Sequence, residues 1–413
     1  MGYKPKVRFN GFTNDWEQRK CKDIFDKVGN PVETKEDETY REIGIRSHGK
    51  GIFYKDEVTS KDLGNKRVFW IEPDCFILNI VFAWERAVAR TTEKELGMIA
   101  SHRFPMYKPK AGVVDLDYIT KFFTTDKGKD ILEMASPGGA GRNKTLGQKE
   151  FADSKLWLSS YDEQKKIGKL IDELDKAIDL QQRKCDETKE LKKYMLQKLF
   201  PKNGAKKPEI RFNGFTDDWE QRKFGDIIDK LTGGASIAPD DYVEEGYRTI
   251  PKGAVNDTGL ADMSDCKCVS EVFYQKNISC KTSAGELVTS LRDLVPTAPN
   301  MGRIVRIYGD SEDFLMPQGV YSIVLKKNFD EDFLIAYSNS PDYRRIITTE
   351  KNGSTQVHIR NGVFLNIDIP VPSYEEQKKI GATIRNLDNL ITLHQRKYEE
   401  LITLKQFFLR NMF

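Results

Sequence analysis

The sequence predicts a mixed α/β protein in which two globular domains are separated by a long antiparallel two-helix coiled coil with pseudo-two-fold symmetry. Three observations lead to this fold class. A stretch of 41 residues with the pattern of one long helix occurs twice, a stretch of 20 residues precedes each copy, and the regions between them combine strand and helix patterns. Internal repeats are considered first because every other assignment must fit them.

The longer repeat covers residues 160–200 and 373–413. The two copies are offset by 213 positions without a gap and are identical at 21 of 41 positions. Each starts with Ser and Glu at the spacing of a capping box, Ser160 and Glu163 in the first copy, and continues without Pro. Apolar residues recur at steps of three and four, which is typical of coiled-coil a and d positions. About 40 residues at about 1.5 Å each predict helices of about 60 Å.

The shorter repeat opens each half of the chain. Residues 5–24 and 208–227 are identical at 15 of 20 positions, with an offset of 203. Because the two ends of a domain often lie close together, the second long helix is expected to run back along the first, antiparallel to it. The predicted division is a first domain at 1–158, a long helix at 159–201, a second domain at 208–372 and a second long helix at 373–413.

The two regions between the repeats have the mixture expected of α/β domains. Short apolar runs bounded by turn residues predict strands, and longer runs with helical spacing predict helices. The predicted strands are Val68–Ile71, Phe76–Phe82, Ile304–Tyr308, Val320–Leu325 and Val363–Val371, and the predicted helices are Tyr118–Phe123, Lys129–Met134 and Phe333–Ser338.

Composition excludes several classes of protein. No stretch is apolar for 18 residues, so no membrane span is expected. The six cysteines show no C-x-x-C spacing, and after Cys266, Cys268 and Cys280 no His follows before His358, so no metal site is expected. Unpaired cysteines of this kind fit a reducing cytoplasm.

The motifs of common enzymes are also missing. Residues 138–145 read Gly-Gly-Ala-Gly-Arg-Asn-Lys-Thr, which resembles a phosphate-binding loop, but Asn143 replaces the Gly that this motif requires before Lys. No Asn-Pro-Pro-aromatic or Asp-Pro-Pro-aromatic tetrapeptide is present, so the chain does not look like an adenine methyltransferase by itself. We therefore expect no catalytic residues in this chain.

The offset of 213 identifies two polar segments as candidates for ligand contact. It places residues 140–146 opposite 353–359 and Phe151 opposite Phe364, so the apolar frame is shared while the polar side chains differ. Such side chains can contact base edges or phosphates, although a solvated turn has the same composition. The candidates from these segments are Arg142, Asn143, Lys144, Ser354, Thr355, Gln356 and His358.

Overall charge does not indicate a basic protein. Residues 28–160 contain 21 basic and 20 acidic side chains, and residues 231–373 contain 14 basic and 19 acidic ones, a net charge of 14 − 19 = −5. DNA-binding proteins usually carry a basic surface, so any such surface must be local here. The local clusters add Arg46, Ser47, His48, Lys50, His102, Arg103, Arg344 and Arg345 to the candidates.

With these features in place, the chain resembles the specificity subunit of type I restriction–modification enzymes over essentially its full length. The resemblance rests on IGIRSHGKGIF at residues 43–53, the duplicated openers, and SYDEQKKIG and SYEEQKKIG at the start of the two long helices. One departure is Leu158-Ser159, where the second copy has Val371-Pro372 as the family usually does.

The resemblance implies a non-catalytic subunit that binds double-stranded DNA. Each domain would be a target recognition domain for half of a split DNA site, and the helices would set the distance between the half-sites. Two methyltransferase subunits and two restriction subunits would be the partners, and S-adenosylmethionine, ATP and Mg²⁺ would belong to them rather than to this chain. The alternative from sequence is a two-domain coiled-coil adaptor for protein partners, which would not retain specific DNA.

Overall fold

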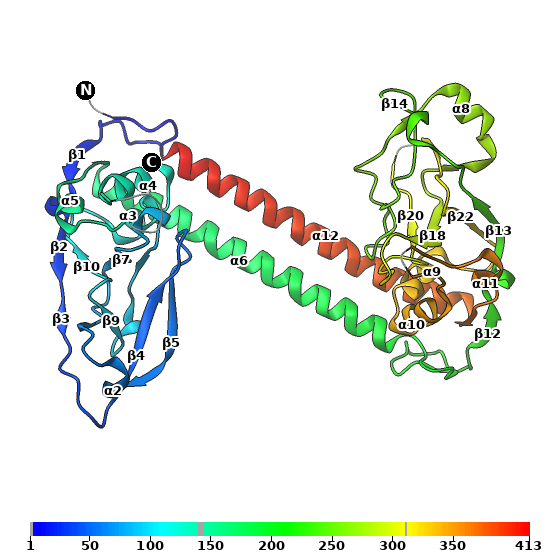
Figure 1. Cartoon of the computed structure of the whole chain (residues 1–413), viewed down its shortest axis with the longest axis horizontal. Coiled ribbons are helices and arrows are strands. Elements are labelled where there is room, and N and C mark those ends of the chain that lie inside the picture. The colour runs from blue at the N-terminus through cyan, green and yellow to red at the C-terminus, as the bar shows by residue number, and fades with distance from the viewer. Residues whose placement is uncertain (1–2, 139–143, 310–311, 355) are drawn as a thin grey trace. The chain divides into compact units, whose positions relative to one another are not determined.

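The computed structural model describes residues 3–138, 144–309, 312–354 and 356–413. They form two compact units, which we call unit 1 and unit 2. Unit 1 runs to Gln181 and also contains Lys397–Phe413, whereas unit 2 is Gln182–Arg396. Each unit therefore contains part of both long helices, α6 (Tyr161–Lys198) and α12 (Tyr374–Asn411) (Figure 1).

Unit 1 is built on a four-stranded antiparallel sheet in the order β2-β10-β7-β8. Phe76 of this sheet stacks on Phe123 and Phe151, which come from the helical segments that follow it. The strands are β2 (Phe25–Val28), β7 (Phe76–Leu78), β8 (Val88–Arg90) and β10 (Met106–Pro109), and the helices are α1 (Cys21–Ile24), α2 (Ser60–Leu63), α3 (Leu116–Phe122), α4 (Asp126–Met134) and α5 (Gln148–Asp153). The 3₁₀ turns in the described part of unit 1 include η1 (Ala83–Glu85) and η2 (Glu93–Glu95).

Two further sheets complete unit 1. The opener strand β1 (Glu17–Lys20) pairs with β11 (Lys155–Leu158), directly before α6. A five-stranded sheet in the order β3-β6-β9-β4-β5 carries a long hairpin of β4 and β5 (Figure 1). Its strands are β3 (Asn30–Pro31), β4 (Thr39–Ile45), β5 (Ile52–Thr59), β6 (Val68–Trp70) and β9 (Ile99–Ser101).

Unit 2 contains a four-stranded sheet with the same connectivity, in the order β13-β22-β18-β20, and its opener strand β12 (Glu220–Lys223) pairs with β24 (Asp368–Val371). The sheet strands are β13 (Ile228–Gly233), β18 (Leu287–Ser290), β20 (Ile304–Arg306) and β22 (Val320–Leu325). The helices are α7 (Phe224–Ile227), α8 (Glu271–Lys276), α9 (Glu331–Ser338), α10 (Pro341–Glu350) and α11 (Asn361–Leu365), with 3₁₀ turns η4 (Pro239–Asp241) and η5 (Ile278–Cys280). Smaller sheets are formed by β14 (Tyr242–Val243), β15 (Tyr247–Arg248), β16 (Cys268–Val269), β17 (Lys281–Ser283), β19 (Arg292–Asp293), β21 (Asp313–Leu315) and β23 (Val357–His358).

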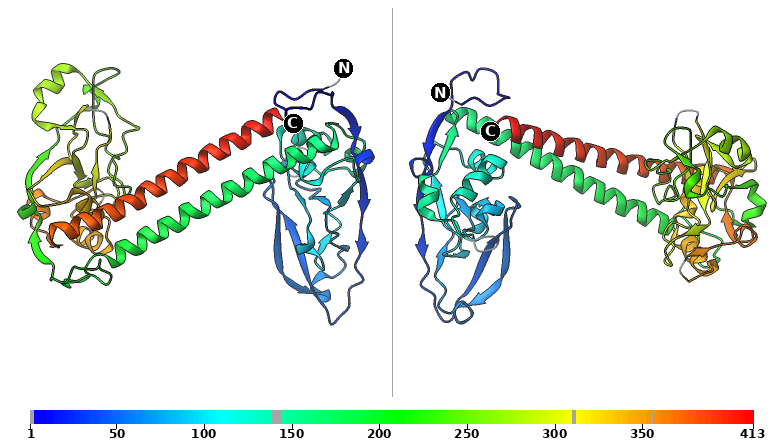
Figure 2. Two further views of the ribbon diagram at one scale, coloured as in Figure 1. Left: turned by 180° about the vertical axis from the view of Figure 1, so that it is seen from behind. Right: turned by 45° about the horizontal axis from the view of Figure 1, so that its top comes forward.

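The two long helices run antiparallel, as predicted. In unit 1 the start of α6 and the end of α12 share one core, which contains Ile167, Ile171 and Met412 with Phe408 packed against it. In unit 2 the end of α6 and the start of α12 share the other core, which contains Leu196 and Ile380. Figure 2 shows the C-terminal end of α12 beside the start of α6.

One ion pair between the helices is made twice. Asp175 of α6 pairs with Lys405 of α12 in unit 1, and Asp388 of α12 pairs with Lys192 of α6 at 2.5 Å in unit 2. The offset of 213 relates the two aspartates (175 + 213 = 388) and the two lysines (192 + 213 = 405). The lysines at the equivalent positions 192 and 405 therefore each pair with an aspartate on the other helix.

Some boundaries differ from the sequence predictions. Val363–Val371 is not one strand, because its first part belongs to α11 and only Asp368–Val371 is extended. In α11, Phe364 is fully buried and stacks on Phe224 at 4.8 Å, and this packing overrides the strand pattern. The strand predicted at Phe76–Phe82 ends at Leu78, since Asn79 accepts hydrogen bonds from Val81 and Phe82 and starts a turn.

Over the described ranges, no helix has the length and apolar character that crossing a membrane requires. Within the same ranges, no group of three or more His, Cys, Asp or Glu side chains is arranged to hold a metal ion.

Candidate nucleic-acid interface

In unit 1 several of the described candidate residues meet at the loop that follows β7, residues 79–87. This loop contains η1, and it receives contacts from three segments that are far apart in sequence. Ile80 N–H donates to the carbonyl of Arg103 at 3.0 Å, and its carbonyl accepts from Leu146 N–H at 2.8 Å. Arg103 and Leu146 are thus brought to one place by a single residue of the loop.

The turn between β4 and β5 is tied to the same loop. Ser47 Oγ donates to Glu85 Oε2 at 2.7 Å, and His48 N–H donates to the Glu85 carbonyl at 2.8 Å. His48 has a positive φ of 62° and starts the sharp turn. Arg46, over the Phe53 ring at 5.1 Å, and Lys50 are exposed on either side of it.

Lys144 reaches the loop from the other side of unit 1. Its Nζ lies 5.7 Å from the centroid of the Trp84 ring and donates to Glu133 Oε1 at 2.5 Å. The hydrogen bond and the charge of Lys144 hold the pKa of Glu133 below its ordinary value. Lys144 is therefore positioned by two contacts, one aromatic and one acidic.

His102 lies near this cluster on the connection from β9 to β10. It is exposed, and its N–H donates to the Arg67 carbonyl at 3.0 Å. It lines a cavity of about 400 Å³ together with Lys27, Arg67 and Phe69. Three basic side chains thus surround one concave surface.

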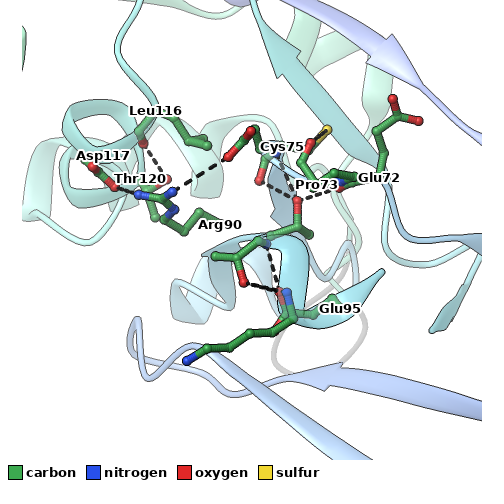
Figure 3. A network of polar contacts seen from close by, with 12 residues as sticks. Glu72, Pro73, Cys75, Arg90, Glu95, Leu116, Asp117 and Thr120 are labelled. Carbon is green, nitrogen blue, oxygen red and sulfur yellow. Dashed lines mark hydrogen bonds and ion pairs between the residues drawn. The ribbon is translucent and has the colours of Figure 1, made fainter. Parts of the chain in front are cut away.

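The strand at the other end of the loop is held by a polar network (Figure 3). Arg90 of β8 pairs with Asp117 of α3, and Thr91 Oγ1 donates to the Glu72 carbonyl at 2.6 Å while accepting from Cys75 N–H. Since β7 and β8 bound the loop, this network fixes where the loop leaves and re-enters the sheet.

Unit 2 repeats the arrangement at the loop after β18, residues 291–303. Ile359 N–H donates to the Leu291 carbonyl at 3.0 Å, and position 359 is the repeat equivalent of Leu146 (146 + 213 = 359). His358 lies opposite Arg292 where β23 pairs with β19. Ser354, Gln356 and His358 are exposed on this side of unit 2.

The two arginines of α10 have different surroundings. Arg344 donates to the carbonyls of Met301 at 2.6 Å and of Ala298 and Pro299 at 3.1 Å, so it supports the loop from beneath. Burial lowers the pKa of Arg344 to about 10. Arg345 is exposed and pairs with Asp342 at 2.8 Å.

The remaining candidates, Arg142, Asn143 and Thr355, lie outside the described residues. Sequence reasoning missed the two loops themselves, including Trp84, Arg86 and Arg292. Their only sequence signal was position, since each loop follows an inner strand of a four-stranded sheet, β7 in unit 1 and β18 in unit 2.

Two α/β units with one connectivity, joined through two repeated helices and each carrying its own polar cluster, define a scaffold with two recognition modules. Residues 216–403 match the family model described as the type I restriction modification DNA specificity domain. Over most of its length the chain is similar to specificity subunits of type I restriction–modification systems.

Three similar proteins illustrate the relationship. The type I restriction enzyme MjaVIII specificity subunit of Methanocaldococcus jannaschii is 24% identical over 360 residues, which cover 84% of this chain and 80% of that protein. The S subunit of a type I system from M. genitalium has a TM-score of 0.59 and 13% identity over 100% of this chain and 99% of that one. A chain from a structural study of complex assembly in a type I system has a TM-score of 0.51 and 16% identity, with coverage of 96% and 97%.

Proposed function

We propose that each unit of this chain binds one half of a bipartite DNA target, with unit 1 using the loop at 79–87 and unit 2 the loop at 291–303. The observation that carries this proposal is the shared frame. Leu146 and Ile359 make equivalent hydrogen bonds to these loops, whereas the polar residues around them differ between the units. Two units with one fold and different polar surfaces can bind two DNA half-sites of different sequence.

The chemistry of the clusters fits base and phosphate contacts. Arg, Lys, Gln, Ser and His side chains bind base edges in the major groove or hold phosphates. Lys50, Arg103 and Gln356 are exposed and lie outside the helices and strands. The near-neutral charge of the whole chain is compatible with this, because the basic residues are gathered locally.

In this proposal the chain contributes no catalytic residue. Two methyltransferase subunits bind the chain together with DNA, and two restriction subunits join them. S-adenosylmethionine, ATP and Mg²⁺ are bound by those partners, and the complex acts in the cytoplasm on cellular DNA. The similarity of the chain to specificity subunits and the duplication of its helices, which offers two equivalent docking surfaces, support this stoichiometry.

The test uses the complex purified with its methyltransferase partner. Replacement of Arg142, Asn143, Lys144, Ser354, Thr355, Gln356 and His358 by Ala should relax the target. A residue that contacts a base edge should cost about 1–3 kcal/mol at one position, whereas a phosphate contact should weaken binding to all sequences evenly. Changes in residues 142–144 should affect one half-site and changes in residues 354–358 should affect the other.

Lys184→Ala, at an exposed position of α6, is the control. Unchanged binding and methylation in the sevenfold variant would remove these segments from the site.

A further inference from the structure

Two aliphatic side chains protrude from the loop at 291–303 of unit 2. Leu294 is 65% exposed and Val295 is 45% exposed, and the neighbouring residues 296 and 297 are exposed as well. We call Leu294 and Val295 the apolar tip. Neither side chain belongs to a core cluster of unit 2, so their apolar character does not serve the fold.

Two hydrogen bonds hold the backbone of the apolar tip in its turn. Asp293 Oδ1 accepts from Val295 N–H at 3.1 Å, and the Val295 carbonyl accepts from Ala298 N–H at 3.0 Å. Ala298 has a positive φ of 49°, a backbone conformation that costs free energy for a residue with a Cβ. The surrounding structure must therefore impose this conformation.

Three cationic side chains impose it by binding the carbonyls of the loop. Lys351 Nζ donates to Pro296 O at 2.7 Å, Arg303 Nε donates to Pro299 O at 3.0 Å, and Arg344 binds the three carbonyls named above. A loop fixed in this way loses little entropy when a ligand binds its tip.

The cationic side chains around the loop indicate that a ligand of the apolar tip carries negative charge. Arg303 and Arg344 donate to backbone carbonyls, and Arg292 and Lys351 lie at the same loop. The negative charges of Asp257 and Asp293 act on Arg303 and Arg344 and counter part of the pKa lowering that burial causes. Four basic side chains against these two acidic ones leave a positive potential at the loop. An apolar tip above such a potential fits a polyanion that also has apolar groups.

We propose that the apolar tip contacts the 5-methyl group of a thymine in the major groove of the half-site bound by unit 2. The thymine methyl is the one apolar group that a base pair presents there. Phosphates of the same DNA would lie toward the cations. This inference rests on the proposed function, and it adds a specificity contact that uses no hydrogen bond.

Unit 1 has a related feature at its own loop. Phe82, in the loop after β7, is 36% exposed and lies two residues from Trp84. Both units therefore expose an apolar side chain on the loop after the equivalent strand, although the two loops share neither length nor sequence.

The experiment measures binding of the complex with its methyltransferase partner to DNA that carries its target. Each thymine of the unit 2 half-site is replaced in turn by deoxyuridine, which lacks only the methyl group. At least one replacement should weaken binding by the wild-type complex about three- to fivefold, the effect of removing one buried methyl-sized group. The double variant Leu294→Ser/Val295→Ser should bind more weakly and should not respond to that replacement.

Val272→Ser is the matched control, since Val272 is 80% exposed on α8 of the same unit and should keep the full response to deoxyuridine. The inference is overturned if the half-site has no thymine, if no replacement weakens wild-type binding, or if the double variant keeps the response. It is also overturned if the double variant loses its methyltransferase subunit, which would make the tip a protein contact. A wild-type complex with no sequence preference would instead refute the proposed function.

Discussion

At the scale of single residues, the Glu at the start of each long helix is explained by an ion pair with an Arg of the opener. Glu163 is fully buried and accepts from Arg8 Nε at 2.7 Å and Nη2 at 2.8 Å, and Glu376 pairs with Arg211 in the same way. The capping-box prediction assigned this Glu to the N-terminus of its own helix, whereas the structure gives it a partner in the opener. In each unit, the short repeat therefore supplies the Arg and the long repeat supplies the Glu of one ion pair.

We expect Arg8→Ala to lower the free energy of unfolding of unit 1 by about 3–5 kcal/mol, because it leaves a buried carboxylate without its partner. Arg211→Ala should have a similar effect on unit 2. Arg19→Ala removes an exposed partner of Glu17 and should change stability by less than about 0.5 kcal/mol. Denaturant unfolding of the three variants checks this, and equal effects from Arg8 and Arg19 would contradict it.

The two equivalent aspartates of the long helices, Asp175 and Asp388, should make stability depend on pH in opposite ways. Burial raises the pKa of Asp175, but hydrogen bonds from Lys121 and Lys405 outweigh burial and leave the pKa below its ordinary value. Burial raises the pKa of Asp388 above its ordinary value, and its partner Lys192 does not offset this. Folding therefore favours the charged form of Asp175 and the protonated form of Asp388.

At pH 7, Asp175→Asn should lower the free energy of unfolding by about 1–3 kcal/mol, and Asp388→Asn should lower it by less. The stabilisation from Asp175 is lost as the pH falls through its lowered pKa. The contribution of Asp388 is lost as the pH rises through its raised pKa, so wild type should gain stability relative to Asp388→Asn between pH 7 and about pH 4.5. Unfolding curves of both variants at the two pH values measure this, and a larger loss for Asp388→Asn at pH 7 would be inconsistent with it.

At the scale of elements, each long helix is docked against the start of a short helix in its own unit. Gln164 of α6 accepts from the backbone N–H of Asp115, the residue that caps α3, at 3.0 Å, and Gln377 of α12 accepts from Asp330, the cap of α9, at 2.9 Å. The glycine four residues further on allows the close approach. The repeated EQKKIG sequence is therefore a docking motif within the chain.

Replacing that glycine should destabilise the unit, although Ala normally favours a helix over Gly. A Cβ at Gly381 would lie 2.6 Å from Phe333 N, and at Gly168 it would lie 2.9 Å from Tyr118 N. We expect each Gly→Ala change to cost about 1–3 kcal/mol, because the helix must move away. Gly362→Ala in α11, where no heavy atom lies within 4 Å, should be neutral or stabilising. Thermal unfolding distinguishes the cases, and stabilisation by Gly381→Ala would rule out the close approach.

At the scale of the whole molecule, duplication gives two units that share a frame and differ in surface. The sheets β2-β10-β7-β8 and β13-β22-β18-β20 follow one order, and their openers and long helices are repeats. Under the proposed function, the target of each unit and the spacing of the half-sites are separable properties.

Exchange of residues 28–157 for the same region of a relative should change one half of the DNA target only. Insertion of one heptad into each long helix, between the two repeated ion pairs, should change only the gap between half-sites. A heptad adds about 10 Å of helix and a base pair advances about 3.4 Å, so the gap should change by up to about three base pairs. Mapping of methylated sites in cells that supply the methyltransferase partner measures both effects. An exchange that altered both half-sites would disprove the modular interpretation.

The sequence by itself determined the two-domain plan, the two long helices and their antiparallel pairing. Local periodicity and duplication predict these features. Both patterns can be recognised in the sequence without knowing which residues are in contact in the folded protein. The offset of 213 even located Leu146 and Ile359, which make equivalent contacts in the structure.

Only the tertiary structure decided how the candidate residues are grouped and what each one contacts. In the structure, Arg103, Lys144 and the turn at 46–50 contact the loop at 79–87. Arg344 donates to carbonyls of the loop at 291–303. The structure also shows that the Glu163 carboxylate accepts hydrogen bonds from Arg8, whereas the capping-box pattern predicted a contact with its own helix. The physical reason is that pairing between strands and contacts of long side chains join residues that are distant in sequence, and such contacts leave no periodic trace in the chain.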